Sequence, residues 1–161
     1  MRSDASHAES IERLYKERFP KFLRVAEAIV GEQEAARDAV QEAFIRALRH
    51  RRKFRGDGPL EGWVWRIVVN EARRICIAKS RVHARTTTTE HTSNGHVPDG
   101  DLRALIAALP ERQRLAIFLR YYADLDYAAI GEVLDVERGT VSATLHAAHS
   151  NLRRALEEVA R

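Results

Sequence analysis

The chain has 161 residues, 45% hydrophobic and 31% charged, which is the balance of a folded protein with one ordinary core or two small ones. No stretch approaches the roughly 18 apolar residues of a membrane span, and the polar first ten residues lack the apolar segment of a secretory signal, so we expect a cytoplasmic protein with no membrane contact. The net charge of +4 is unevenly spread, because residues 46–85 carry 12 basic and three acidic residues. This block favours a polyanionic partner, although a solvated basic helix surface would have the same composition.

Two successive helices are predicted near the N-terminus, over residues 8–18 and 20–30. Apolar residues recur every three to four positions throughout this stretch, but Pro20 interrupts it, and proline opens a helix more easily than it continues one. Gly31 should end the second helix. A third helix is predicted over about 32–50, where apolar residues fall within one arc.

The third predicted helix also carries a stripe opposite its core face. Helical spacing brings four side chains onto this stripe: Asp38, Gln41, Glu42 and Ile45. Two carboxylates, an amide and an exposed isoleucine form a surface on which a partner protein can dock. A simple solvated face explains the same pattern, and the residues alone favour that simpler explanation.

A basic loop with two glycines, residues 51–59, leads into a fourth predicted helix over about 60–80. The apolar stripe of this helix includes Trp63, whereas Trp65 falls off the stripe and is expected to be available for binding. Cations, aromatic rings and amides are the groups that grip phosphates and exposed bases. The candidates for this role are Arg52, Lys53, Phe54, Arg55, Gly56, Arg66, Asn70, Arg73 and Arg74.

Residues 86–100 hold one aliphatic residue, Val97, among threonine, glycine, proline and other polar residues, and they show no helical or strand period. We interpret this segment as a flexible linker. The predicted fold is therefore all-α, with two small helical domains joined by a flexible linker.

The part after the linker has the proportions of a helix-turn-helix domain. A short helix is stopped by Pro110 and another helix follows; then a helix over 127–134 and a long helix from Arg138 onward flank a three-residue turn. Any pair of antiparallel helices has similar periodicity, but the tight turn and its buried apolar residues favour DNA binding. The residues expected to face outward and reach a major groove are Arg138, Gly139, Thr140, Ser142, Ala143, His146, His149 and Arg153.

Nothing in the sequence indicates catalysis, because no phosphate-binding loop, carboxylate pair or nucleophile with a recognisable base is present. His146 and His149 stand three residues apart, but no carboxylate or cysteine accompanies them on the helix, so we expect no metal site. The single cysteine, Cys76, has no partner for a disulfide bond. We therefore predict no enzymatic activity and no cofactor.

Three motifs together resemble one known family. They are Asp38-Ala-Val-Gln41-Glu42-Ala-Phe44, then Gly62-Trp63-Val-Trp65-Arg66-Ile67-Val-Val-Asn70, and finally Leu109-Pro110-Glu111-Arg112-Gln113-Arg114 before the helix-turn-helix. In this order, on two domains joined by a polar linker, they are similar to the bacterial extracytoplasmic-function sigma factors. The resemblance implies that residues 8–80 are region 2, residues 81–100 a linker and residues 101–158 region 4.

The resemblance also implies partners and roles. Core RNA polymerase would bind through the clamp helices of its largest subunit and through its flap, and the clamp helices would contact Asp38, Gln41, Glu42 and Ile45, in place of the solvated face favoured by the residues alone. The minus-ten promoter element would be held and melted by the loop and fourth helix, through Arg52, Lys53, Phe54, Arg55, Gly56, Arg66, Asn70, Arg73 and Arg74. The minus-thirty-five element would be read by Arg138, Gly139, Thr140, Ser142, Ala143, His146 and Arg153. The linker would lie near the RNA exit path, and an anti-sigma factor is a candidate further partner.

Two features depart from the family pattern. Asp135 stands where the family usually has a glycine, although we still expect the turn to form. The outward face of the last helix has fewer basic residues than is usual, which predicts a weak phosphate grip upstream. The leading alternative is a helix-turn-helix regulator whose first domain binds a ligand or dimerises, and a small helical enzyme is the third possibility.

Overall fold

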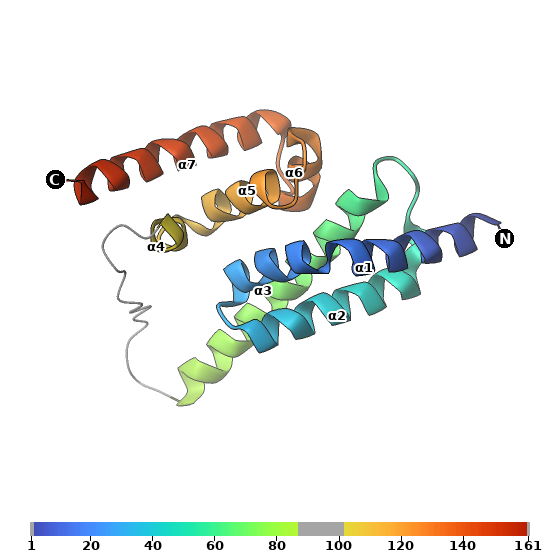
Figure 1. Ribbon diagram of the computed structural model, residues 1–161. Helices are drawn as coiled ribbons and strands as arrows, with labels where there is room; N and C mark the ends of the chain where they lie inside the picture. The colour runs from blue at the N-terminus through green and yellow to red at the C-terminus, as the bar shows by residue number, and fades with distance from the viewer. Residues whose placement is uncertain (1, 87–101, 161) are drawn as a thin grey trace.

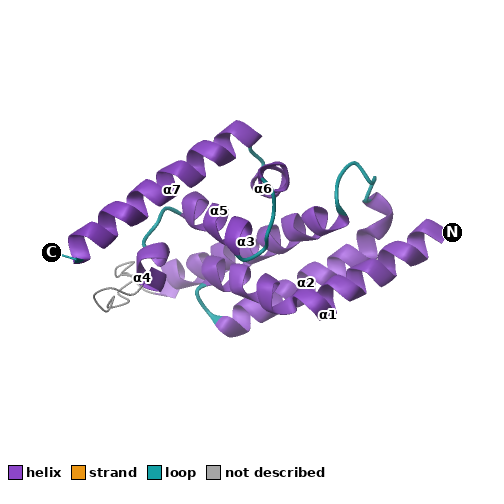
Figure 2. Cartoon of the chain, turned by 45° about the horizontal axis from the view of Figure 1, so that its top comes forward, coloured by secondary structure: helices purple, strands orange, loops and turns teal. Residues whose placement is uncertain are grey.

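The computed structural model describes residues 2–86 and 102–160, and every regular element within them is helical (Figures 1 and 2). The elements are α1 (Arg2–Val30), α2 (Gln33–His50), the short 3₁₀ turn η1 (Arg51–Lys53), α3 (Leu60–Thr86), α4 (Leu102–Ala107), α5 (Glu111–Tyr121), α6 (Tyr127–Leu134) and α7 (Arg138–Val159). Helices α1 to α3 form one group, here called the first bundle, and α4 to α7 form the second bundle (Figure 1). The prediction of an all-α fold with two helical domains is confirmed.

The prediction of two helices before residue 31 is wrong, because α1 runs without a break from Arg2 to Val30 and contains Pro20. An internal proline costs a helix about 3 kcal/mol, since it lacks an N–H group and crowds the preceding turn. Apolar side chains on both sides of the proline offset this cost, because Ile11 and Phe22 are both fully buried in the same core. Tertiary packing therefore keeps the helix continuous.

The core of the first bundle is built around Trp65, and this corrects a second prediction. Trp65 is fully buried with its ring 4.1 Å from that of Phe22, measured between centroids, whereas Trp63 is only partly buried. The roles of the two tryptophans are therefore the reverse of those expected. Helix α3 packs against both α1 and α2, so its buried face is wider than the single stripe used for the prediction. The wider face takes in positions 64, 65, 68, 69 and 72.

The helix-turn-helix elements begin and end where the sequence predicted them. Asp126 caps α6 by accepting a hydrogen bond from the backbone N–H of Ala129 at 2.8 Å. Asp135 ends the helix in the left-handed conformation, with φ of 56°, and so fulfils the role of the glycine usual in the family. Gly131 is needed for another reason, because a side-chain carbon placed on it would lie 2.7 Å from the carbonyl oxygen of Val136.

The remaining boundaries differ modestly from prediction. Helix α3 continues to Thr86, beyond the expected end near 80, while positions 87–101 of the predicted linker lie outside the described residues. Leu156 has the helical spacing of the apolar stripe formed by Val141, Leu145 and Ala148. Those three side chains are buried, but Leu156 is 43% exposed. Within residues 2–86 and 102–160, no helix has both the length and the apolar character to cross a membrane.

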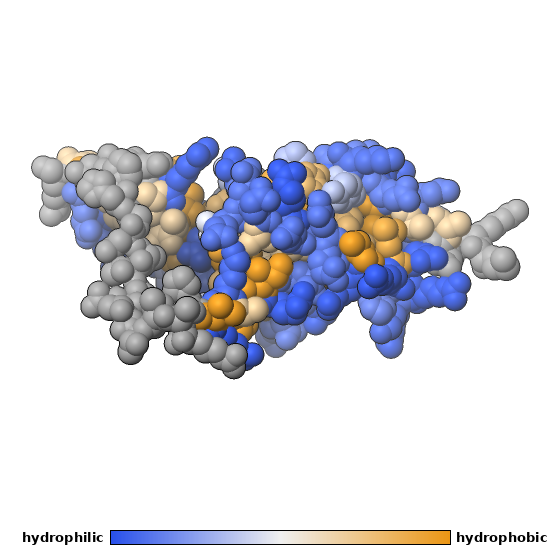
Figure 3. All heavy atoms as spheres, turned by 90° about the horizontal axis from the view of Figure 1, so that it is seen from below, coloured by the Kyte–Doolittle hydropathy of each residue, from blue (hydrophilic) through white to orange (hydrophobic). Residues whose placement is uncertain are grey.

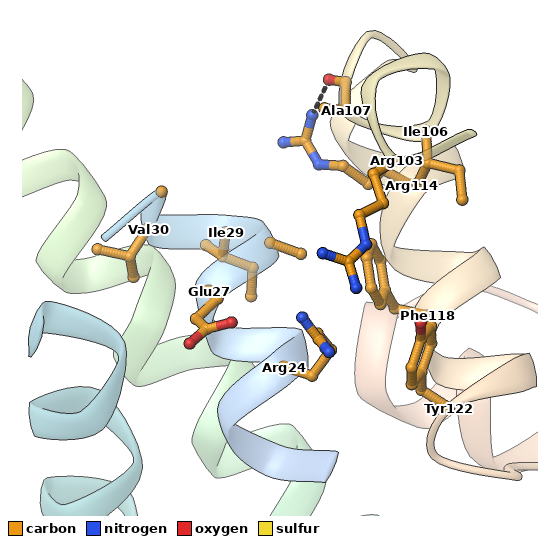
Figure 4. A pocket seen from close by; sticks show the side chains of 12 residues that line it. Arg24, Glu27, Ile29, Val30, Arg103, Ile106, Ala107, Arg114, Phe118 and Tyr122 are labelled. Carbon is orange, nitrogen blue, oxygen red and sulfur yellow. Dashed lines mark hydrogen bonds between the residues drawn. The ribbon is translucent and has the colours of Figure 1, made fainter. Parts of the chain in front are cut away.

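The two bundles lie against each other, with α6 on α3 and α5 on α1. A cavity of about 640 Å³ remains between them, lined on one side by the end of α1 and on the other by α4 and α5 (Figure 4). Arg24 of α1 reaches across this space toward the ring of Tyr122, 5.9 Å from the ring centroid. The two bundles therefore contact each other over only part of the surfaces that face each other.

Candidate polymerase and nucleic-acid interfaces

The stripe predicted on α2 faces outward from the first bundle. Asp38, Gln41 and Ile45 are exposed and Glu42 is half-buried, while Val40, Ala43, Phe44 and Ala47 on the opposite side are buried. The stripe is thus presented from a helix that its own core holds rigidly. The face of the molecule seen in Figure 3 is mainly hydrophilic, with apolar patches interspersed.

A shallow apolar groove adjoins this stripe, and sequence reasoning missed it. The groove has a volume of about 330 Å³ and runs between α1 and α2, with Gln41 and Ile45 in its wall. Tyr15, Phe44 and Leu48 supply much of its apolar lining. The only hint in the sequence was the exposed isoleucine, since the α1 side of the groove becomes visible only when the two helices are packed together.

The basic loop is anchored by its aromatic residue. The ring of Phe54 lies 5.7 Å from that of Trp63 and 5.3 Å from that of His7, measured between centroids, and it is half-buried. Gly56 has φ of +77°, which favours glycine at this turn. The loop therefore packs the ring of Phe54 against the first bundle. Around this ring, the basic residues Arg52, Lys53 and Arg55 are exposed, and so is Gly56.

On α3, Arg66 and Asn70 are exposed on one face, as predicted. Arg74, further along, is engaged by Glu71, whose side chain is 2% exposed. Glu71 Oε2 accepts a hydrogen bond from Arg74 Nε at 2.9 Å, and Glu71 Oε1 lies 2.8 Å from a terminal guanidinium nitrogen of Arg46 on α2. A buried carboxylate needs such partners, so Glu71 ties α2 to α3.

Glu71 was not identified from the sequence as a structural residue. The available signal was its place between Val68, Ala72 and Ile75 on the buried side of the helix, in a block that is otherwise strongly basic. An acidic residue in such a position predicts a local ion pair with neighbouring cations.

Among the described residues, two of the ion pairs connect the first bundle to the second. Arg73, a predicted DNA contact, donates from Nε to Glu111 Oε1 of α5 at 2.9 Å. Lys21 of α1 donates to the carboxylate of Asp124 in the loop after α5. This hydrogen bond and the positive charge of Lys21 hold the pKa of Asp124 below its ordinary value of 3.8.

The outward face of α7 is as predicted. Val141, Leu145 and Ala148 are buried, and the predicted outward set is exposed: Arg138, Gly139, Thr140, Ser142, Ala143, His146, His149 and Arg153. The two histidines differ in their surroundings, because Nε2 of His149 lies 3.0 Å from the hydroxyl oxygen of Tyr121. His149 therefore contacts Tyr121 of its own domain as well as lying on the outward face.

Comparison with known proteins identifies both halves of the chain. The family model described as Sigma-70 region 2 matches residues 14–82, and that described as Sigma-70, region 4 matches residues 99–159. The RNA polymerase sigma-H factor of Pseudomonas aeruginosa is 28% identical over 160 residues, covering 88% of this chain and 83% of that protein. The RNA polymerase sigma factor YlaC of Bacillus subtilis is also 28% identical over 160 residues, covering 92% of each chain.

Among solved structures, the sigma factor RpoE from Bartonella quintana, in complex with the anti-sigma factor NepR, aligns with a TM-score of 0.74. It is 18% identical and the alignment covers 92% of this chain and 98% of that one, which shows a shared fold. The two family regions occur in order on the two helical bundles. The chain belongs to the extracytoplasmic-function sigma factors, the subunits that direct bacterial RNA polymerase to promoters and so initiate transcription.

Proposed function

We propose that this sigma factor binds core polymerase through the stripe on α2, with Asp38, Gln41, Glu42 and Ile45 contacting the clamp helices of the largest subunit. The observation that carries the proposal is the juxtaposition of these side chains with the apolar groove between α1 and α2. The charged groups can fix the orientation of a bound protein, and the apolar groove supplies surface that this protein can bury. Protein interfaces combine both properties. The flap of the polymerase is the corresponding partner for the second bundle.

The minus-ten element is assigned to the first bundle. The exposed cations of the loop and of α3 lie beside the anchored ring of Phe54, and this mixture suits a single strand whose bases have left the stack. On α3, Arg74 is paired with the buried carboxylate of Glu71 and Arg73 with the exposed carboxylate of Glu111, while Arg66 and Asn70 are exposed. Residues 8–80 therefore act as region 2, with the segment 81–100 connecting them to region 4 at 101–158.

The minus-thirty-five element is assigned to α7, whose exposed small and polar side chains suit base edges more than phosphates. An anti-sigma factor is proposed as a regulator, because the structural neighbour from Bartonella quintana is itself bound to one. The protein would act in the cytoplasm, where polymerase and DNA meet, and would contribute no catalytic group of its own.

Reconstitution with core polymerase tests the proposal. Wild-type chain is mixed with core enzyme, isolated as a complex, and assayed by run-off transcription on genomic fragments. A sigma factor gives discrete transcripts that core enzyme alone does not give. A helix-turn-helix regulator would bind DNA without retaining core polymerase, and that result would contradict the proposal.

A further inference from the structure

The cavity beside the end of α1 has the size of a site for a small organic molecule. Its volume of about 640 Å³ lies within the range of roughly 300–1,000 Å³ that is typical of such sites. Helix α1 forms one wall, and α4 and α5 form the other (Figure 4). Among its described lining residues, none belongs to those proposed above to contact polymerase or DNA. Its chemistry is therefore separate from that of the proposed interfaces.

Arginines dominate the polar part of the lining. Arg24, Arg103 and Arg114 line the cavity, whereas Glu27 is the only acidic residue among its described lining residues. The guanidinium groups of Arg24 and Arg103 extend into the cavity from opposite walls (Figure 4). Two positive groups that face each other repel, and an anion held between them is attracted to both. The cavity therefore favours an anionic ligand.

Arg114 supports the wall to which Arg103 belongs. A terminal guanidinium nitrogen of Arg114 donates to the carbonyl oxygens of Ala107 at 2.8 Å and Leu109 at 3.3 Å, at the end of α4 and just beyond it. Its Nε is buried and has no hydrogen-bond partner among the described residues. A buried donor without a partner is costly, and a negative charge in the adjoining cavity would offset part of that cost.

The wall formed by α5 is aromatic. The rings of Phe118 and Tyr122 stack on each other, with centroids 5.3 Å apart and an angle of 28° between their planes. Tyr122 is 43% exposed, so part of its ring is accessible to a ligand. Ile29 and Ile106 add apolar surface to the two walls. A flat apolar group can bury its surface here while a negative group lies near the arginines.

We propose that this cavity binds a small organic phosphate, in which a phosphate monoester is attached to a flat aromatic body, as in a mononucleotide. The phosphate lies between Arg24 and Arg103, because guanidinium groups form paired, charge-assisted hydrogen bonds with phosphate oxygens. The lining has three arginines and one glutamate, and this excess of two positive charges matches a phosphate dianion. The aromatic body lies against Tyr122. Such a molecule would act on the protein without covering the proposed polymerase and DNA contacts.

Isothermal titration calorimetry on the free full-length chain tests the inference. The probe is adenosine 5′-monophosphate (AMP), and adenosine and inorganic phosphate are titrated separately as its two halves. The variants Arg24→Gln and Arg103→Gln each remove one of the facing cations. Arg49→Gln is the matched control, because Arg49 is exposed on α2, outside the cavity and within the strongly basic block 46–85. Circular dichroism checks the fold of every variant.

Wild-type chain should bind AMP saturably with a Kd below about 1 mM, and each half should bind at least about tenfold more weakly. Arg24→Gln and Arg103→Gln should each lower AMP affinity about tenfold or more, whereas Arg49→Gln should leave it unchanged. The absence of saturable AMP binding would overturn the inference. An equal loss in Arg49→Gln would overturn it too, because the phosphate would then be bound by the general positive charge of the chain.

Two further variants make the test independent of any loss of folding. Glu27→Gln should raise AMP affinity about twofold to fivefold, because it removes a negative charge that repels the phosphate. Tyr122→Leu should weaken binding of AMP but leave binding of inorganic phosphate unchanged. Weaker AMP binding in Glu27→Gln, or wild-type AMP binding in Tyr122→Leu, would overturn the assigned ligand class. The assay contains neither polymerase nor DNA, so its result stands apart from the proposed function.

Discussion

The two helices proposed to touch DNA, α3 and α7, present their charges in opposite ways. Two arginines of α3 are paired with carboxylates, Arg74 with buried Glu71 and Arg73 with Glu111 of the other bundle. The predicted outward face of α7 is exposed and carries only two arginines among small and polar residues. The comparison teaches that the first bundle carries many cations of which some are already paired with carboxylates, whereas the second exposes few cations among polar side chains.

The largest effect is expected on α2, the helix proposed to bind core polymerase. Asp38→Arg combined with Glu42→Arg should lower affinity for core polymerase more than about a hundredfold, because two attractive groups become repulsive at the centre of the interface. Co-purification with core enzyme measures this drop in affinity, and circular dichroism should show an intact fold. Glu157→Arg with Glu158→Arg is the matched control, and a similar drop in that control would contradict the assignment.

Substitutions at the turn between α6 and α7 should change the stability of the second bundle. Gly131→Ala should lower the free energy of unfolding by about 1–3 kcal/mol, because the added carbon would lie 2.7 Å from the carbonyl oxygen of Val136. Asp135→Gly should act in the opposite direction, by about 0.5–1 kcal/mol, since it relieves a left-handed non-glycine residue. Urea denaturation measures both variants, and a neutral Gly131→Ala would mean that the turn relaxes freely.

The difference in charge between α3 and α7 predicts different salt dependence. Arg66→Ala with Arg73→Ala should make the plot of log affinity against log salt for single-stranded DNA shallower by about one to two, because each arginine removed leaves one phosphate without its neutralising cation. Ser142→Ala on α7 should leave the slope of duplex binding unchanged and alter the preferred minus-thirty-five sequence. An unchanged slope in the α3 variant would mean that other side chains neutralise the phosphates.

The two histidines of α7 offer a finer comparison within one helix. His146 is on the outward face, whereas His149 is joined to Tyr121. If His146 faces a phosphate, duplex binding should strengthen as pH falls from about 8 to 6, because an imidazolium attracts a phosphate more strongly than a neutral imidazole does. His146→Gln should remove this dependence and His149→Gln should keep it, as measured by anisotropy on minus-thirty-five DNA. Identical profiles for both variants and wild type would contradict the phosphate role.

The smallest effect concerns the pH dependence of the contact between bundles. The hydrogen bond and charge of Lys21 lower the pKa of Asp124 in the folded protein, so the pair stabilises it above the ordinary pKa of 3.8 and loses this effect as pH falls through the lower, folded value. The difference in unfolding free energy between wild type and Lys21→Met should therefore shrink as pH falls below about 4. Urea denaturation at about pH 7, 5 and 3 measures this, and a difference that grows at low pH would contradict the sign.

Local signals predicted some features well. The bounds of α6, its turn and the start of α7 follow from neighbouring residues, such as the cap at Asp126 and the apolar spacing of Val141 and Leu145, so they could be predicted almost residue by residue. The prediction of which side chains of α2 and α7 face outward was also correct, because each helix buries one clear face.

The errors came from packing between distant segments. Pro20 was expected to break a helix because a local rule does not include the burial of Ile11 and Phe22 on either side of it. Trp65 was placed outside the core because α1 and α2 together bury a wider face of α3 than the single stripe used for the prediction. The pairing of Arg73 with Glu111 joins residues 38 positions apart on different bundles, which no local period reveals.

The buried carboxylate of Glu71 has a mechanical consequence. By holding Arg46 of α2 and Arg74 of α3 at once, it joins the helix proposed to grip polymerase to the helix proposed to grip the promoter strand. Because Glu71 connects α2 to α3, we expect a displacement of one helix to move the other. Movement of the polymerase clamp would then be transmitted directly to the melted strand, so the sigma factor would serve as a rigid arm of the enzyme as well as a reader of sequence.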